Sequence, residues 1–242
     1  MKKWVSNGVE LSLINNLTSI NDILTKYADN KAKSIILDNI KYDYKISDGD
    51  SLKLITFFDT IKLNLCISIE MNINKFCYFN LGKDIFNAIE TLNTEKKMII
   101  TSSFIKVTFK GTKTNQLIKE FLAWRNKYAH GKNPFNKNGN FVNEESNIED
   151  EQAESDIELI IDIMKAIIET CRNYMEIEKY LNDNNKYELS IADNEYLKDI
   201  ANLLLLIEYN CSILKEDVTT KEYISKILDK HQKELEEITK EK

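Results

Sequence analysis

The sequence predicts an all-α protein. Only 6 glycines and 1 proline occur among 242 residues, so residues that interrupt helices are scarce. Hydrophobic residues make up 43% of the chain, which is enough for a packed core. In most segments they recur at the three- and four-residue spacing of a helix. These observations favour long helices over a turn-rich β fold.

The first 95 residues are predicted to be largely helical. Apolar residues at helical spacing predict a helix over 9–30, and a second helix is expected over about 31–40. Residues 48–51 (Asp-Gly-Asp-Ser) are predicted to form a turn and cap before a strongly apolar helix that runs through about Met71. A short helix is expected over 82–93.

Residues 98–109 leave two alternatives open. They are rich in β-branched and aromatic side chains, which favours a small β-hairpin. A helix of unusual composition is the other interpretation. A break is predicted at 111–114 in either case.

A helix is predicted over residues 114–130, because Gly131 is placed to cap its C-terminus and Pro134 lies just beyond. The polar, asparagine-rich segment 131–150 is predicted to be a long flexible loop. Three further helices are predicted over 151–181, about 193–214 and about 219–240.

The cysteines and the chain start carry little functional signal. None of the four cysteines forms a C-x-x-C pair and the histidines are not spaced as zinc partners, so we expect buried, reduced thiols and no metal site. The N-terminus lacks the apolar core of a signal peptide, and no apolar run is long enough to cross a bilayer. A cytoplasmic protein without membrane contact is therefore expected.

Charge is distributed unevenly along the chain. The overall net charge is −6, but residues 96–137 contain ten basic residues and a single acid, Glu120, whereas residues 144–169 contain ten acids and a single base, Lys165. The basic segment is either a phosphate-binding surface or a solvated face that pairs with the acidic segment. Charge alone does not separate these interpretations.

The most informative stretch is residues 124–130 (Trp-Arg-Asn-Lys-Tyr-Ala-His). The chain has two tryptophans, two arginines and two histidines, and one of each lies here. On a helical wheel, Trp124 and Tyr128 join the apolar stripe and Lys127 faces solvent. Arg125 falls inside the apolar arc, a costly position unless a neighbouring acid pairs with it or it faces a polar cleft.

Residues 125–130 resemble the Arg-polar-x-x-x-His signature of the HEPN superfamily, whose members are α-helical domains and include many ribonucleases of toxin–antitoxin, abortive-infection and CRISPR systems. The match covers one helix. It implies a HEPN-like bundle over 96–242, with 1–95 as additional helices that are either accessory or integral to the bundle. One position departs from the pattern, because Lys132 stands where toxins paired with a nucleotidyltransferase antitoxin commonly have tyrosine.

The resemblance implies metal-independent RNA cleavage that needs no cofactor and leaves 2′,3′-cyclic phosphate ends. It implies that His130 acts as general acid or base, that Arg125 holds the scissile phosphate, and that Asn126 orients His130 or a phosphate oxygen. Since one histidine is too few for both proton transfers, a homodimer with facing motifs is expected, as is an antitoxin or defence-system partner. The lysines expected to contact RNA are Lys119, Lys127, Lys132 and Lys137.

Two alternatives stay open. The first is a non-catalytic HEPN-like module that binds RNA, a nucleotide or a protein partner. The second is a helical interaction protein in which Arg125 is a structural ion pair in the core. Fold resemblance alone does not decide between these classes.

Overall fold

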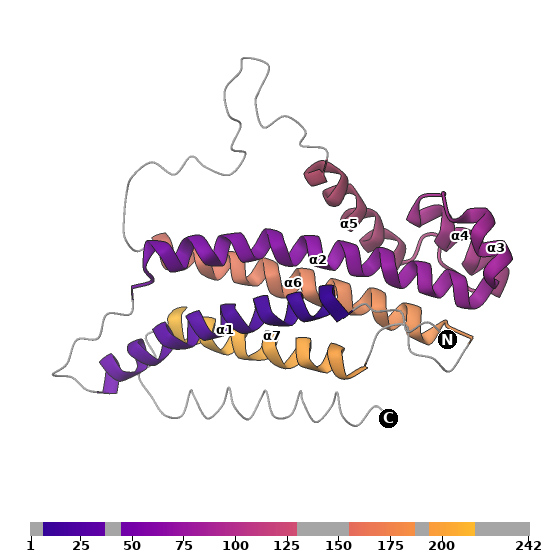
Figure 1. Cartoon of the computed structure of the whole chain (residues 1–242). Helices are drawn as coiled ribbons and strands as arrows, with labels where there is room; N and C mark the ends of the chain where they lie inside the picture. Colours follow the sequence, from indigo (N-terminus) through magenta and orange to yellow (C-terminus); the bar gives the residue numbers. More distant parts are fainter. Residues whose placement is uncertain (1–6, 37–44, 130–154, 187–193, 216–242) are drawn as a thin grey trace, which may run out of the picture. The chain divides into compact units, whose positions relative to one another are not determined.

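The computed structural model describes residues 7–36, 45–129, 155–186 and 194–215, and this part of the chain is folded into helices without any strand (Figure 1). The all-α prediction is therefore confirmed. The helices are α1 (Asn7–Ile36), α2 (Asp48–Leu81), α3 (Lys83–Ile89), α4 (Thr94–Ile105), α5 (Lys113–Ala129), α6 (Ser155–Asp183) and α7 (Asn194–Lys215).

The chain divides into two compact units. Unit 1 is drawn from the segments Met1–Val9, Leu63–Gln152 and Arg172–Asp193. Unit 2 is drawn from Glu10–Lys62, Ala153–Cys171 and Asn194–Lys242. The organisation into 1–95 and 96–242 that the sequence suggests stays a prediction.

Unit 1 contains the C-terminal part of α2, all of α3, α4 and α5, and the C-terminal part of α6. Figure 1 shows α3 and α4 beside the C-terminal end of α2, and α4 packs against α5. Apolar side chains from α2, α4, α5 and α6 form its core, among them Leu65, Ile69, Ile73, Phe76, Met98, Ile118, Phe121 and Ile177. The core therefore holds α5, which carries Arg125, against neighbouring helices.

Residues 98–105 belong to α4, so the β-hairpin considered for 98–109 is wrong. Local hydrogen bonds explain why a β-branched sequence is helical here. The Asn93 side chain caps the helix by accepting from the backbone N–H of Lys96, and the Thr101 hydroxyl donates to the carbonyl of Lys97 one turn earlier. Lys106 ends the helix in the left-handed conformation, at φ 63°.

Unit 2 contains α1, the N-terminal parts of α2 and α6, and α7. Leu13, Leu17, Ile20 and Leu24 of α1 are fully buried, as their helical spacing predicts. Side chains join α1 to α7, which lie side by side in Figure 1, because Asn210 donates to Asn21 at 3.1 Å and to Thr25 at 2.9 Å.

Two helices are longer than predicted. The helix expected over 9–30 continues without a break to Ile36, since no glycine or proline follows it there; residues 37–40 of the second expected helix lie outside the described residues. The helix expected to end near Met71 continues to Leu81 and stops at Gly82, which adopts φ 78°. Residues 48–51, expected as a turn and cap, are already the first turn of α2, and the Ser47 hydroxyl caps it by accepting from the backbone N–H of Asp50. The helix predicted over 219–240 and the loop predicted over 131–150 lie outside the described residues.

The four cysteines are free and buried, as predicted. Burial raises the pKa of Cys77 to about 11 and those of Cys171 and Cys211 to about 12, far above the usual range of a thiol. Such thiols stay protonated near neutral pH and are poor nucleophiles. Chemistry based on these cysteines is therefore not expected.

Candidate functional site

Helix α5 positions the site. It follows Gly111, which adopts φ 84°, and the Thr112 hydroxyl caps it by accepting from the backbone N–H of Asn115 at 3.2 Å. One face of the helix is buried through Leu117, Ile118 and Phe121. The opposite side is exposed and carries Gln116, Lys119, Glu120, Asn126 and Lys127. The apolar stripe therefore fixes the rotation of α5 and with it the direction of Arg125.

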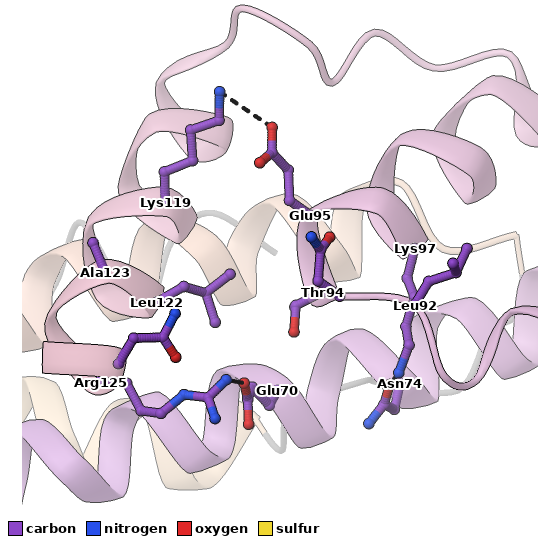
Figure 2. A pocket seen from close by; sticks show the side chains of 12 residues that line it. Glu70, Asn74, Leu92, Thr94, Glu95, Lys97, Lys119, Leu122, Ala123 and Arg125 are labelled. Carbon is purple, nitrogen blue, oxygen red and sulfur yellow. Dashed lines mark hydrogen bonds and ion pairs between the residues drawn. The ribbon is translucent and has the colours of Figure 1, made fainter. Parts of the chain in front are cut away.

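Arg125 forms an ion pair with Glu70 of α2, through its Nη2 and the Oε1 of the carboxylate (Figure 2). The two side chains are 36% and 30% exposed, so the pair is not part of the core. The guanidinium Nε is buried and has no hydrogen-bond partner among the described residues. Arg125 therefore retains a donor that the described protein does not satisfy.

A cavity of about 460 Å³ lies beside this pair, within unit 1. Its wall is formed by the C-terminal part of α2, the turn before α4, the first turn of α4, and α5. The residues that line it are Glu70, Asn74, Leu92, Asn93, Thr94, Glu95, Lys97, Lys119, Leu122, Ala123, Arg125 and Asn126. At its position in the apolar arc Arg125 needs either an acidic partner or a polar cleft, and the structure shows both.

Two further cations line the cavity, each with a different partner. Lys119 of α5 pairs with Glu95 of α4, with 3.1 Å between Nζ and Oε1. Lys97 of α4 donates to the side-chain oxygen of Asn74 of α2 at 2.9 Å. Figure 2 shows these contacts around the cavity together with the Arg125–Glu70 pair. The lining therefore combines three cations with two carboxylates, a net charge of +1.

The structure brings together some of the predicted site residues. Arg125, Asn126 and Lys119 line the cavity, whereas Lys127 is exposed and does not. Trp124, expected in the core, is only half-buried. His130, Lys132 and Lys137 lie outside the described residues, so their assignments stay predictions.

Sequence reasoning missed Glu70, Asn74 and Lys97. Glu70 and Asn74 are four residues apart on α2, a spacing that places two side chains on one face of a helix. Their partners were not predictable, because Glu70 and Arg125 are 55 residues apart in the sequence.

Other kinds of site find no support in the described part of the chain. No group of histidine, cysteine, aspartate or glutamate side chains there is arranged to hold a metal ion. Among the same residues, no helix is both long and apolar enough to span a membrane. The polar cavity beside Arg125 is therefore the strongest candidate site.

Comparison of the chain with protein-family models, with curated proteins and with solved structures finds no match. The fold and the site together define an all-α protein with a polar cavity next to Arg125 of helix α5.

Proposed function

We propose that the protein is a metal-independent endoribonuclease of HEPN type that acts as a toxin or antiphage-defence effector. The observation that carries the proposal is the position of Arg125 and Asn126 in the wall of a polar cavity, five and four residues before His130 in the sequence. These are the residues through which the chain resembles the HEPN signature.

The chemistry assigned to these residues is a transesterification. The ribose 2′-oxygen attacks the phosphorus, its proton passes to a base, and the 5′-oxygen of the next nucleotide leaves with a proton. Arg125 offers a phosphate oxygen the guanidinium N–H groups that Glu70 does not take, and a guanidinium stabilises the charge that develops during attack. His130 is the proposed proton donor or acceptor, because histidine is the side chain whose unperturbed pKa lies near neutrality.

Glu70 suits a positioning role in this scheme. Its carboxylate holds one terminal nitrogen of Arg125 and restricts the guanidinium to a few orientations. Because the remaining N–H groups are not taken by Glu70, the same arginine retains donors for a phosphate. An ion pair and a substrate contact are therefore compatible at Arg125.

A second copy of the chain is part of the proposal. Residues i and i+5 of a regular helix point about 140° apart, so Arg125 and His130 of a single helix do not converge on one phosphate by helix geometry alone. Two copies with facing motifs supply the histidine pair that an acid and a base require. An antitoxin or a defence-system protein is the proposed regulatory partner.

RNA cleavage in the presence of EDTA tests the function. We expect wild-type protein to cut total RNA with EDTA present and to leave 2′,3′-cyclic phosphate ends. His130→Ala should lower the cleavage rate by at least ~100-fold, the usual contribution of a general acid or base. His231→Ala, which changes the chain's other histidine, is the matched control and should retain full activity.

Three results contradict the proposal. If His130→Ala cleaves as wild type does, the catalytic assignment of His130 is wrong; if wild type does not cleave at all, non-catalytic binding of RNA, a nucleotide or a protein partner becomes the better account of the cavity. If EDTA abolishes cleavage, the metal-independent mechanism is wrong.

A further inference from the structure

Lys97 is a buried cation beside the cavity. Its residue is only 7% exposed, although lysine side chains usually reach solvent with their ammonium group. Burying a charge is costly unless a partner compensates it. Lys97 is therefore a residue whose position needs a physical reason.

The described protein does not supply a counter-charge for Lys97. Its Nζ donates to the neutral side-chain oxygen of Asn74 at 2.9 Å and lies 5.9 Å from the centre of the Phe86 ring. Within the described residues no carboxylate pairs with it. An ammonium group has three donors, so hydrogen-bonding capacity remains after the bond to Asn74.

The other two cations of the cavity differ in this respect. Arg125 is paired with Glu70 and Lys119 with Glu95, so the net positive charge of the lining resides at Lys97. Glu70 and Asn74 lie one turn apart on α2, about 6 Å along the helix axis. One helix face therefore anchors Arg125 through a carboxylate and Lys97 through an amide.

We propose that this cavity binds a phosphate group of a nucleotide through Lys97, beside the phosphate that Arg125 contacts. The inference rests on the proposed function, and adds Lys97 and Asn74 to the site. An anionic oxygen at Lys97 supplies the missing counter-charge, and a charge-assisted hydrogen bond is stronger than a neutral one. A cavity of about 460 Å³ is within the size range of small-ligand sites, so it has room for a phosphate with part of its nucleoside.

Asn74→Asp tests the inference most sharply. It places a carboxylate where Asn74 now accepts from Lys97, without changing the size of the side chain, and so neutralises Lys97 as Glu70 neutralises Arg125. Lys97→Gln is the complementary variant, which removes the cation itself. Lys83→Gln is the matched control, because Lys83 is exposed in the same unit and does not line the cavity.

The measurement is the affinity for a fluorescent single-stranded 2′-O-methyl oligonucleotide, which cannot be cleaved, over a series of salt concentrations. Asn74→Asp and Lys97→Gln should each weaken binding by about tenfold, the loss of one charge-assisted contact. Lys97→Gln should also lower the salt slope by about 0.7, the value for one phosphate of a single strand. Lys83→Gln should stay within twofold of wild type. Thermal unfolding of each variant checks that it is folded.

A second arm uses a nucleoside 3′-monophosphate in place of the oligonucleotide. If Lys97→Gln weakens binding of both probes, the ligand is a phosphate of an RNA strand. If Lys97→Gln weakens binding of the nucleoside 3′-monophosphate alone, the ligand is a free nucleotide.

Unchanged affinity of folded Asn74→Asp and Lys97→Gln in both arms overturns the inference, and so does a wild type that binds neither probe. These outcomes are distinct from failure of the proposed function. If wild-type protein does not cleave RNA while Lys97 still controls binding, the ribonuclease proposal fails and the phosphate site stands.

Discussion

Two carboxylates of α2 have opposite surroundings. Asp50, in unit 2, accepts from Tyr27 at 2.8 Å, from Lys53 at 2.9 Å and from Lys26 at 3.3 Å, and its side chain is 14% exposed. Glu70, in unit 1, has Arg125 as its ion-pair partner, beside a cavity that the side chains of both residues line. Asp50 is therefore surrounded by hydrogen-bond donors. Glu70 pairs with a partly exposed arginine whose Nε has no partner among the described residues.

This difference separates a structural network from a candidate site. The Asp50 network has its partners in place, since the Tyr27 hydroxyl also accepts from the backbone N–H of Ser47 at 3.1 Å and so joins α1 to the start of α2. A carboxylate in the first turn of α2 is further favoured by the helix dipole. Arg125 lines a cavity and keeps a donor that the described protein does not satisfy. We therefore expect mutations at Asp50 to change stability and mutations at Arg125 to change activity.

The largest effect is expected at Arg125. Arg125→Gln should lower the rate of RNA cleavage by at least ~100-fold, because it removes the guanidinium that we propose stabilises the phosphate charge. It should change the free energy of unfolding by less than about 1 kcal/mol, because the pair with Glu70 is partly exposed. Cleavage assays and urea denaturation measure the two quantities. Arg172→Gln, at the other arginine of the chain, is the control; a large loss of stability in Arg125→Gln would instead indicate a structural ion pair.

Asp50→Asn should reverse this pattern. It should lower the free energy of unfolding by roughly 1–3 kcal/mol, because hydrogen bonds to a charged group are lost in a mostly buried position. RNA cleavage by the folded variant should be unchanged. A variant with wild-type stability and impaired cleavage would contradict the assignment of Asp50 to a structural role.

The same aspartate should make stability depend on pH. Hydrogen bonds from Lys53 and then Tyr27 hold the pKa of Asp50 below its usual value, which is about 3.9 in an unfolded chain. The contribution of Asp50 is therefore complete above that value and is lost as the pH falls towards the folded-state pKa. The stability difference between wild type and Asp50→Asn should shrink as the pH falls from about 5 to about 3; a difference that stays constant would show that the charge of Asp50 is not its source.

The smallest effect is expected at Tyr27. Tyr27→Phe removes the hydroxyl that donates to Asp50 and accepts from Ser47, and should lower the free energy of unfolding by about 1 kcal/mol. Denaturation at neutral pH measures this change. In the Asp50→Asn background the added loss should be smaller, because the two residues share a hydrogen bond. Simple additivity would contradict the view of these residues as one network.

The sequence was sufficient for the fold class but not for several helix boundaries. Apolar spacing and scarce glycine predicted long helices, and Gly82 was an unused signal for the end of α2. Helix α4 was ambiguous because its β-branched residues favour a strand, whereas its cap at Asn93 favours the helix. Composition left hairpin and helix open for this segment, and the structure shows a helix with a capping hydrogen bond at Asn93.

For the candidate site, the periodicity of α5 singled out Arg125 but not the residue that it contacts. It placed Arg125 where a partner or a cleft was needed, because the apolar stripe of α5 can be read along one helix. It did not predict Glu70 as the partner, and it did not predict that Asn74 accepts from the buried Lys97. Such contacts join residues far apart in the sequence, and they depend on how helices pack.

The burial of all four cysteines has a practical consequence for work on this protein. Buried thiols react slowly with maleimides, so the folded chain is close to a cysteine-free background for site-specific labelling. A single Lys127→Cys substitution, at an exposed position of α5, would carry a spin label next to the motif without removal of any native cysteine. Distances between such labels would report whether two copies of the chain bring their motifs together.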